Sequence, residues 1–342
     1  MAKTVLGIGT SHGPMLSTPP DQWGQRVAAD KRNTEHWYKG KPYTFDQLVA
    51  MRANENLDRQ ITQPVWNERH AACRRAIGKL ADIFAEAKPD IAVIVGNDQM
   101  EMFDDGLIPA MSVYRGETIP NVPNRTRTPG PEWVKRPVWS RRATARYYEE
   151  SETRHYPVDA RLANHLIGAL IDREFDVASA NALPEGEGEG HAFGFVHQRI
   201  LKDVAIPVVP IFLNTYYPPN QPSPRRCYKL GQAIREAVEA YPEKLRIGVV
   251  ASGGRSHFTV DEVLDSEIIR ALREKDANAL QSVPRAQLNS GSSEIRNWIC
   301  AAGALEHLDL RWVHYYPGYR TPAGTGTGLC FASWAWREPN SL

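Results

Sequence analysis

Three histidines each follow a stretch of small or flexible residues. His12 follows Gly-Thr-Ser, His191 follows three alternating Glu-Gly pairs, and His257 follows Ser-Gly-Gly-Arg-Ser. Small residues at the end of a strand let the backbone turn tightly and present a side chain to a ligand. Because imidazole binds metals and titrates near neutral pH, we expect these histidines to hold a metal ion or to transfer protons. A structural role, such as capping of the turn by His12, is the alternative.

Acidic and amide side chains follow one apolar stretch, where the sequence reads Gly-Asn-Asp-Gln-Met-Glu over residues 96–101. Asp98 and Glu101 can bind a cation or orient a neighbouring imidazole. The alternative is that Asn97 and Asp98 only cap a turn or a helix. The motif therefore predicts a polar cluster whose role depends on what lies beside it.

We expect neither a phosphate-binding loop nor a serine nucleophile elbow. The glycines of residues 324–328 have no lysine and no following helix, so they do not fit a phosphate-binding loop. Residues 9–13 read Gly-Thr-Ser-His-Gly and so match Gly-x-Ser-x-Gly, but Gly13-Pro14 indicates a tight turn there instead of the helix that follows a nucleophile elbow. The glutamates of the Glu-Gly repeat are expected to lie in a solvated loop; they are Glu185, Glu187 and Glu189. Four widely spaced cysteines have no zinc spacing and are expected to be reduced and buried: Cys73, Cys227, Cys300 and Cys330.

Short apolar segments rich in β-branched residues alternate with longer helical patterns. The expected strands are 5–9, 91–96, 175–180, 208–213, 246–251 and 312–316, and the expected helices contain 73–84, 162–171, 227–240 and 260–272. This alternation predicts one α/β domain over residues 1–342, with a central mixed or mostly parallel sheet flanked by helices. Ligands of such sheets bind at the carboxyl ends of the strands, where we expect the three histidines.

Two segments interrupt the alternation. Residues 17–65 are polar with several aromatic side chains, and residues 104–157 are rich in proline, arginine, tryptophan and tyrosine. Long insertions in compact domains are usually lids or binding loops, although a surface excursion or a subunit contact is the alternative. We expect residues 104–157 to close over the site, with Trp133 and Trp139 covering a bound ligand. Arginines of this segment, or Arg320, can hold a carboxylate group of that ligand.

The composition excludes several classes of partner. The 41 Lys and Arg residues nearly balance the 40 Asp and Glu residues, and the net charge of +1 argues against a nucleic-acid binder. No run of about 18 uncharged apolar residues is present, which argues against a membrane span. The first residues run into a strand pattern without the core of a signal peptide. We therefore expect a cytoplasmic protein that acts on a small molecule.

The ordered set of motifs resembles the class III extradiol ring-cleavage dioxygenases. Within that family it is most similar to the branch of protocatechuate 4,5-dioxygenase β-subunits and of gallate and 3-O-methylgallate dioxygenases. The resemblance covers nearly the whole chain, through residues 9–14, 96–103, 191–196, 214–227, 252–258 and 293–298. The family association implies a small aromatic substrate and O₂ as partners, and we expect a homo-oligomer.

The resemblance also implies roles for individual residues. It implies a non-haem Fe(II) enzyme that inserts O₂ into a carboxylated catechol or gallate-type aromatic, with the metal held by two histidines and a glutamate. His12 would be the first ligand, Glu262 the nearest match for the carboxylate and His191 the acid/base, while His257 would line the site as a second catalytic histidine. Gln99 stands where the family has its second metal-binding histidine, and an amide is a poorer Fe(II) ligand than imidazole. A metal-independent hydrolase or lyase on the same fold, or a non-catalytic binding subunit, are the alternatives.

Overall fold

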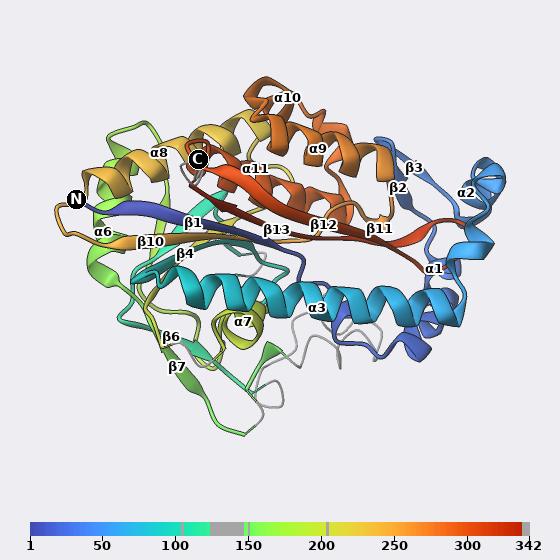
Figure 1. Ribbon diagram of the computed structural model, residues 1–342, viewed down its shortest axis with the longest axis horizontal. Coiled ribbons are helices and arrows are strands. Elements are labelled where there is room, and N and C mark those ends of the chain that lie inside the picture. The colour runs from blue at the N-terminus through green and yellow to red at the C-terminus, as the bar shows by residue number, and fades with distance from the viewer. Residues whose placement is uncertain (104–105, 124–146, 150, 203–204, 337–342) are drawn as a thin grey trace, which may run out of the picture.

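A nine-stranded mixed sheet runs through the middle of the protein (Figure 1). The computed structural model describes residues 1–103, 106–123, 147–149, 151–202 and 205–336. The strand order is β11-β13-β1-β10-β4-β9-β5-β8, and β12 also pairs with β13. The strands are β1 (Lys3–Thr10), β4 (Ile91–Asn97), β5 (Met111–Tyr114), β8 (Ala178–Ala180), β9 (Val208–Leu213), β10 (Arg246–Ser252), β11 (His257–Thr259), β12 (Asp309–Tyr319) and β13 (Thr325–Ala335).

The centre of the sheet is parallel. Strands β1, β10, β4 and β9 pair in parallel, whereas β13 runs antiparallel to β1 and β5 runs antiparallel to β9. The four parallel strands therefore end at the same edge of the sheet, and the loops that follow them lie side by side. This arrangement confirms the predicted fold class. Each of the six predicted strands occurs, although β8 is shorter than the sequence pattern indicates.

Helices cover both faces of the sheet (Figure 1). One core contains side chains of α6 (Ala160–Ile171), α8 (Pro224–Ala240), α9 (Glu262–Glu274), α10 (Ala277–Gln281) and α11 (Ile295–Ala304). The other contains side chains of α3 (Gln63–Ala87) and α7 (His191–Phe195). Strand β4 supplies both cores, because its odd-numbered apolar residues join the first cluster and Ala92 and Ile94 join the second. Burial on both faces explains why its sequence is continuously apolar.

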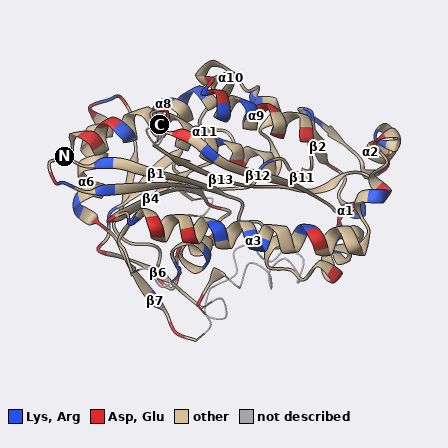
Figure 2. Cartoon of the chain, viewed as in Figure 1, with Lys and Arg blue, Asp and Glu red and all other residues tan. Residues whose placement is uncertain are grey.

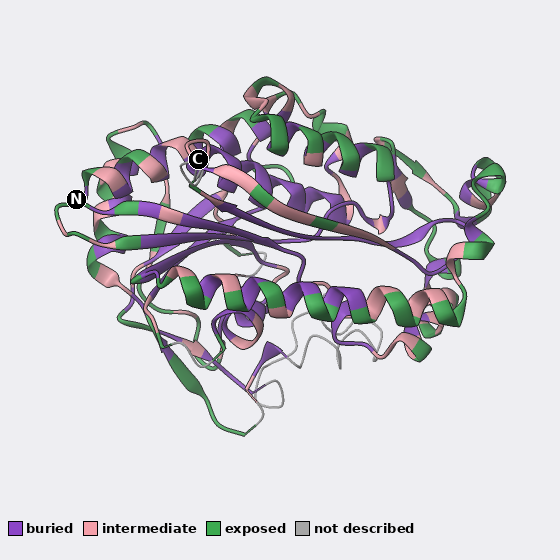
Figure 3. Cartoon of the chain, viewed as in Figure 1, coloured by how far each residue is buried: buried purple, intermediate pink, exposed green. Residues whose placement is uncertain are grey.

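Charge and burial are distributed as in an ordinary globular protein. Lys and Arg are interspersed with Asp and Glu along the outer helices (Figure 2), and the central strands are almost entirely buried (Figure 3). All four cysteines are free and buried, as predicted. Within the part of the chain that the structure describes, no helix is both long and apolar enough to cross a bilayer.

Helices α8 and α11 cross with their backbones nearly in contact. A Cβ atom at Gly231 would lie 1.9 Å from the carbonyl oxygen of Cys300, whereas a Cβ atom at Gly78 in α3 would have no neighbour within 4 Å. Replacing Gly231 with alanine should therefore lower the free energy of unfolding by about 1–3 kcal/mol through overpacking. The Gly78→Ala control should instead raise it by about 0.5–1 kcal/mol, because alanine is the better helix former. Denaturant unfolding of both variants would measure the difference, and equal effects would contradict the close crossing.

Both predicted insertions contain regular structure in their described parts. Residues 17–65 form α1 (Val27–Arg32), the hairpin of β2 (His36–Tyr38) and β3 (Lys41–Tyr43), and α2 (Phe45–Met51). Residues 104–157 contribute β5 to the main sheet and the hairpin of β6 (Thr118–Asn121) and β7 (Arg154–Pro157). The second insertion is therefore partly an element of the fold, because β5 extends the sheet beyond β9.

Candidate active site

Polar side chains from four parallel strands gather at their common carboxyl edge. His12 follows β1, Gln99 follows β4, Tyr216 follows β9 and His257 follows β10. Two further residues reach this edge from helical elements. Glu294 ends the 3₁₀ helix η8 (Ser290–Glu294), and His191 begins α7. The prediction that the three histidines follow strand ends and share one edge is correct for His12 and His257, whereas His191 enters from a helix.

His12 is buried and its tautomer is fixed by its neighbours. Its Nδ1 lies 2.9 Å from the hydroxyl oxygen of Ser252, and that hydroxyl donates to the carbonyl oxygen of Ala192 at 2.6 Å. The Ser252 hydroxyl has one hydrogen, so it accepts from Nδ1–H, and the lone pair of neutral His12 is on Nε2. Burial lowers the pKa of His12, although Glu294 opposes this shift. The neutral ring therefore presents a lone pair at Nε2, which has no hydrogen-bond partner among the described residues.

Glu294 is the carboxylate that faces this lone pair. Its Oε2 lies 3.4 Å from His12 Nε2 and accepts the backbone N–H of Gly254 at 2.6 Å. Its Oε1 accepts the Tyr216 hydroxyl at 2.9 Å and the Gln99 amide at 3.3 Å. Burial by itself would raise the pKa of Glu294, but the positive charge that His12 and His257 carry when protonated holds it well below its usual range. Glu294 is therefore an anion in a buried, polar site.

His257 approaches the other oxygen of the same carboxylate. Its Nδ1 donates to the carbonyl oxygen of Arg255 at 2.6 Å, which leaves the lone pair of the neutral ring on Nε2. That nitrogen lies 3.5 Å from Glu294 Oε1 and 3.3 Å from the Tyr216 hydroxyl. Gly291 makes room for the ring, because a Cβ atom there would lie 1.9 Å from its Cδ2.

The donors around Glu294 fit a divalent cation. Two acceptors, the His12 Nε2 lone pair and the Glu294 carboxylate, face each other in a buried space, and a cation between them would remove their repulsion. No group of three or more His, Cys, Asp and Glu side chains arranged to hold a metal is present in the described ranges. Gln99, the predicted second ligand, contacts Glu294 through its amide NH₂, and His257 presents its Nε2 to the same carboxylate.

His191 belongs to a separate hydrogen-bonded pair next to His12. Its Nδ1 lies 2.8 and 2.6 Å from the two carboxylate oxygens of Glu101, and its ring centroid is 4.8 Å from that of His12. Tyr148, at the end of the 104–157 insertion, donates to Glu101 at 2.8 Å. Tyr147 of the same insertion lies 3.3 Å from the carbonyl oxygen of Gly13. The described residues Tyr147 and Tyr148 therefore lie beside the site, while closure of the insertion over it stays a prediction.

The structure separates Glu262 from this cluster. Glu262 is exposed in the first turn of α9, and the Tyr319 hydroxyl donates to it at 2.5 Å. Glu294, and not Glu262, contacts His12 and His257, while the predicted role of Glu262 as a metal ligand stays a prediction. Sequence reasoning included Glu294 in a motif but gave it no role. The sequence feature that could have pointed to Glu294 is its place at the start of a helical pattern, with apolar residues at 295, 298, 299 and 302.

The remaining predicted residues have different outcomes. Arg320 is buried and lies 3.4 Å from Asp30, with its Nη2 unpaired among the described residues, so its role toward a substrate stays a prediction. Trp133 and Trp139 lie outside the described residues. Glu189 is not in a solvated loop as predicted; it is fully buried, and its Oε1 lies 2.9 Å from Nδ1 of His197.

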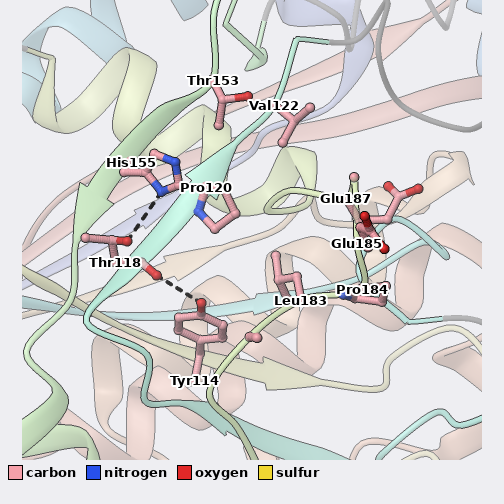
Figure 4. A pocket seen from close by; sticks show the side chains of 12 residues that line it. Tyr114, Thr118, Pro120, Val122, Thr153, His155, Leu183, Pro184, Glu185 and Glu187 are labelled. Carbon is pink, nitrogen blue, oxygen red and sulfur yellow. Dashed lines mark hydrogen bonds between the residues drawn. The ribbon is translucent and has the colours of Figure 1, made fainter.

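A pocket of about 560 Å³ lies elsewhere, between the β6–β7 hairpin and the loop that leads toward His191. Figure 4 shows Tyr114, Thr118 and His155 on one side of it, with Glu185 and Glu187 on the other. No residue of the His12–Glu294 cluster lines this pocket. The pocket is therefore a feature of the surface beside the Glu-Gly repeat and is distinct from the candidate active site.

Comparison with known proteins decides the family. Residues 75–330 match the model of the catalytic LigB subunit of aromatic ring-opening dioxygenase. The chain belongs to this family. The match covers most of the chain, including Gln99, His191, His257 and Glu294, and it confirms the resemblance to the extradiol dioxygenases seen in the sequence. His12 lies before the matched region.

Two curated relatives are similar over shorter regions. The chain is 39% identical to gallate dioxygenase of Pseudomonas putida over 100 residues, which is 29% of this chain and 28% of that protein. It is 25% identical to the 2,3-dihydroxyphenylpropionate/2,3-dihydroxicinnamic acid 1,2-dioxygenase of Comamonas testosteroni over 194 residues, which is 57% of this chain and 51% of that protein. The aligned regions thus span about half or less of each relative's length.

Proposed function

We propose that this protein is an Fe(II)-dependent extradiol dioxygenase that opens the ring of a dihydroxylated aromatic acid. One observation supports this most directly. The lone pair of His12 Nε2 faces the ionised carboxylate of Glu294 at 3.4 Å in a buried site, in a chain of the LigB family. A cation between these facing acceptors would remove their repulsion, and the family supplies the expectation that this cation is ferrous iron.

The residues that would hold the metal are His12, Glu294 and Gln99. When bound, Fe(II) supplies coordination of both substrate hydroxyls and of O₂, together with the redox chemistry that lets O₂ react with an aromatic ring. Ser252 holds His12 in the ligand tautomer, and Gly254 and Tyr216 orient Glu294 through hydrogen bonds. Hydrogen-bonded partners of this kind fix the orientation of metal ligands.

Two histidines are available to move protons. His191 and His257 each have Nδ1 held by an acceptor, so in the neutral ring the proton-accepting nitrogen is Nε2. A substrate hydroxyl in this site would have to lose its proton, and a positioned imidazole is suited to receive and return it. We assign this role to His191 and place His257 beside the carboxylate ligand as the second catalytic histidine.

The names of the relatives support a class of substrate. One is named for gallate and the other for dihydroxyphenylpropionate, and both compounds combine neighbouring ring hydroxyls with a carboxylate. We therefore propose a catechol- or gallate-type aromatic acid as substrate. The insertion that supplies Tyr147 and Tyr148 would form part of its binding site, together with Trp133 and Trp139.

Metal content and turnover test the proposed function. Protein purified without oxygen should contain close to one iron per chain, and it should consume O₂ with a catechol- or gallate-type acid. Removal of iron by a chelator should abolish that turnover, and re-addition of Fe(II) should restore it. Iron-free protein that still turns over such a compound would contradict the proposal and favour the metal-independent hydrolase or lyase.

Replacing Gln99 with histidine should tighten iron binding. Gln99 contacts the carboxylate ligand, and imidazole is a stronger Fe(II) ligand than an amide. We expect the Kd for Fe(II) to fall by about 10-fold or more, which is similar in size to the effect of substitutions beside other metal sites. Competition with a coloured chelator would measure it. An unchanged Kd would show that Gln99 does not contribute a donor.

A further inference from the structure

Glu101 makes a two-oxygen contact with His191. Both carboxylate oxygens lie within 2.8 Å of His191 Nδ1, and Oε2 also accepts the backbone N–H of His191 at 3.2 Å. Both side chains are at most 5% exposed. Because a carboxylate only accepts hydrogen bonds, the hydrogen of neutral His191 lies on Nδ1 and the lone pair on Nε2. Glu101 therefore determines which nitrogen of His191 can accept a proton.

The surrounding residues hold Glu101 in this place. The carboxylate of Asp98 accepts the backbone N–H groups of Glu101, Met102 and Phe103 at 3.0 to 3.1 Å, which fixes the turn. Gly190 lets the backbone before His191 approach the Glu101 side chain, because a Cβ atom at Gly190 would lie 3.0 Å from Glu101 Oε2. Tyr148 donates to Oε1 from the 104–157 insertion. Three separate segments of the chain thus converge on one carboxylate.

A second buried pair of the same type lies nearby and provides a comparison. His197 Nδ1 contacts Glu189 Oε1 at 2.9 Å, and the His197 ring stacks on Tyr156 with a centroid distance of 3.8 Å. This pair stabilises the helix that follows His191, but no contact links it to His12 or Glu294 in the described residues. A merely structural role for Glu101 predicts that the two glutamates behave alike when they are replaced.

We propose that Glu101 is a positioning residue for His191, and that Tyr148 connects the 104–157 insertion to it. Glu101 holds the imidazole in the tautomer whose Nε2 can accept the proton of a substrate hydroxyl. Placement of Tyr148 by the insertion completes the hydrogen bonds of Glu101. The inference rests on the proposed function, in which His191 transfers the proton. It assigns Tyr148, at the described end of the insertion, a part in arranging the acid/base.

The test compares Glu101→Leu and Glu101→Gln with Glu189→Leu. Glu101→Leu removes the acceptor, so we expect kcat to fall by about 10–100-fold, the usual loss when a supporting partner is removed, with KM and iron content unchanged. Glu101→Gln keeps an acceptor oxygen and should restore kcat to within a few-fold of wild type. Glu189→Leu should leave kcat unchanged. Tyr148→Phe removes only a hydroxyl and should lower kcat several-fold. It tests the same arrangement if Glu101→Leu does not fold.

A spectroscopic readout separates this proposal from the proposed function. In ¹⁵N-histidine-labelled protein without substrate or added metal, His191 should show the Nδ1–H tautomer in wild type and Glu101→Gln, and a mixture in Glu101→Leu. A loss of kcat without a tautomer change, or equal losses in Glu101→Leu and Glu189→Leu, would overturn the positioning role. Wild-type protein that opens no aromatic ring would instead overturn the proposed function, and the spectrum would still show whether Glu101 fixes the tautomer.

Discussion

Glu294→Ala should abolish iron binding, whereas Glu262→Ala should leave it unchanged. Glu294 faces His12 Nε2 at 3.4 Å and is held ionised in the buried site, while Glu262 is exposed and contacts Tyr319. Removal of an anionic ligand should weaken iron binding by more than about 100-fold, beyond the roughly 10–100-fold effect of supporting residues. Iron content after anaerobic purification and the Kd for Fe(II) would measure both variants.

Glu294→Gln controls for the loss of hydrogen bonds. Glutamine keeps the shape of the side chain and an acceptor for the Gly254 N–H, but it removes the negative charge. We expect this variant to fold like the wild type and to bind iron poorly. Stoichiometric iron in either Glu294 variant, or loss of iron in Glu262→Ala, would return the carboxylate ligand to Glu262.

His191→Phe should reduce turnover by about 10²–10⁴-fold, the usual contribution of a positioned acid/base. The ring of His191 lies beside that of His12 and its tautomer is fixed by Glu101, but it makes no contact with Glu294 in the described residues. Iron content should therefore stay at the wild-type level. Steady-state kinetics together with metal analysis would check both parts of the prediction.

His197→Phe is the matched control for this variant. His197 is equally buried, is paired with a glutamate and lies six positions further along the chain, but it stacks on Tyr156 away from the metal donors. We expect His197→Phe to lower stability with little effect on kcat. If His191→Phe turns over normally, or if both variants lose the same activity, His191 has a structural role and His257 becomes the proton acceptor.

Much of the fold was predictable because local patterns coincide with burial. The segment Val208–Leu213 was predicted with its observed bounds, since a continuous apolar run bounded by polar residues is typical of a strand covered on both faces. Helix α3 ends at Ala87, just before Lys88-Pro89, as its apolar spacing and the proline indicate. For these elements, one short stretch of sequence is enough to predict the type of element and where it ends.

Other elements depend on partners that are distant in the sequence. Strand β13 begins Thr-Gly-Thr-Gly, which is typical of a loop, yet it spans 11 residues between β1 and β12. Its glycines are needed because neighbours approach closely: a Cβ atom at Gly328 would lie 2.3 Å from the carboxylate of Asp265. Helix α11 was not predicted either, although it is buried along its whole length.

The sequence by itself determined the family, the α/β class and the presence of reactive groups at strand ends. His12, Gln99 and His257 could be placed at one edge because parallel strands share their carboxyl ends. The tertiary structure decided which carboxylates accompany them. Glu262 and Glu294 both lie at helix boundaries and look alike locally, but only Glu294 is carried to His12, because α11 packs against β10 and β4. The metal donors and the histidine tautomers depend on contacts between segments up to about 280 residues apart in the sequence. A local sequence pattern does not predict which distant segments come into contact.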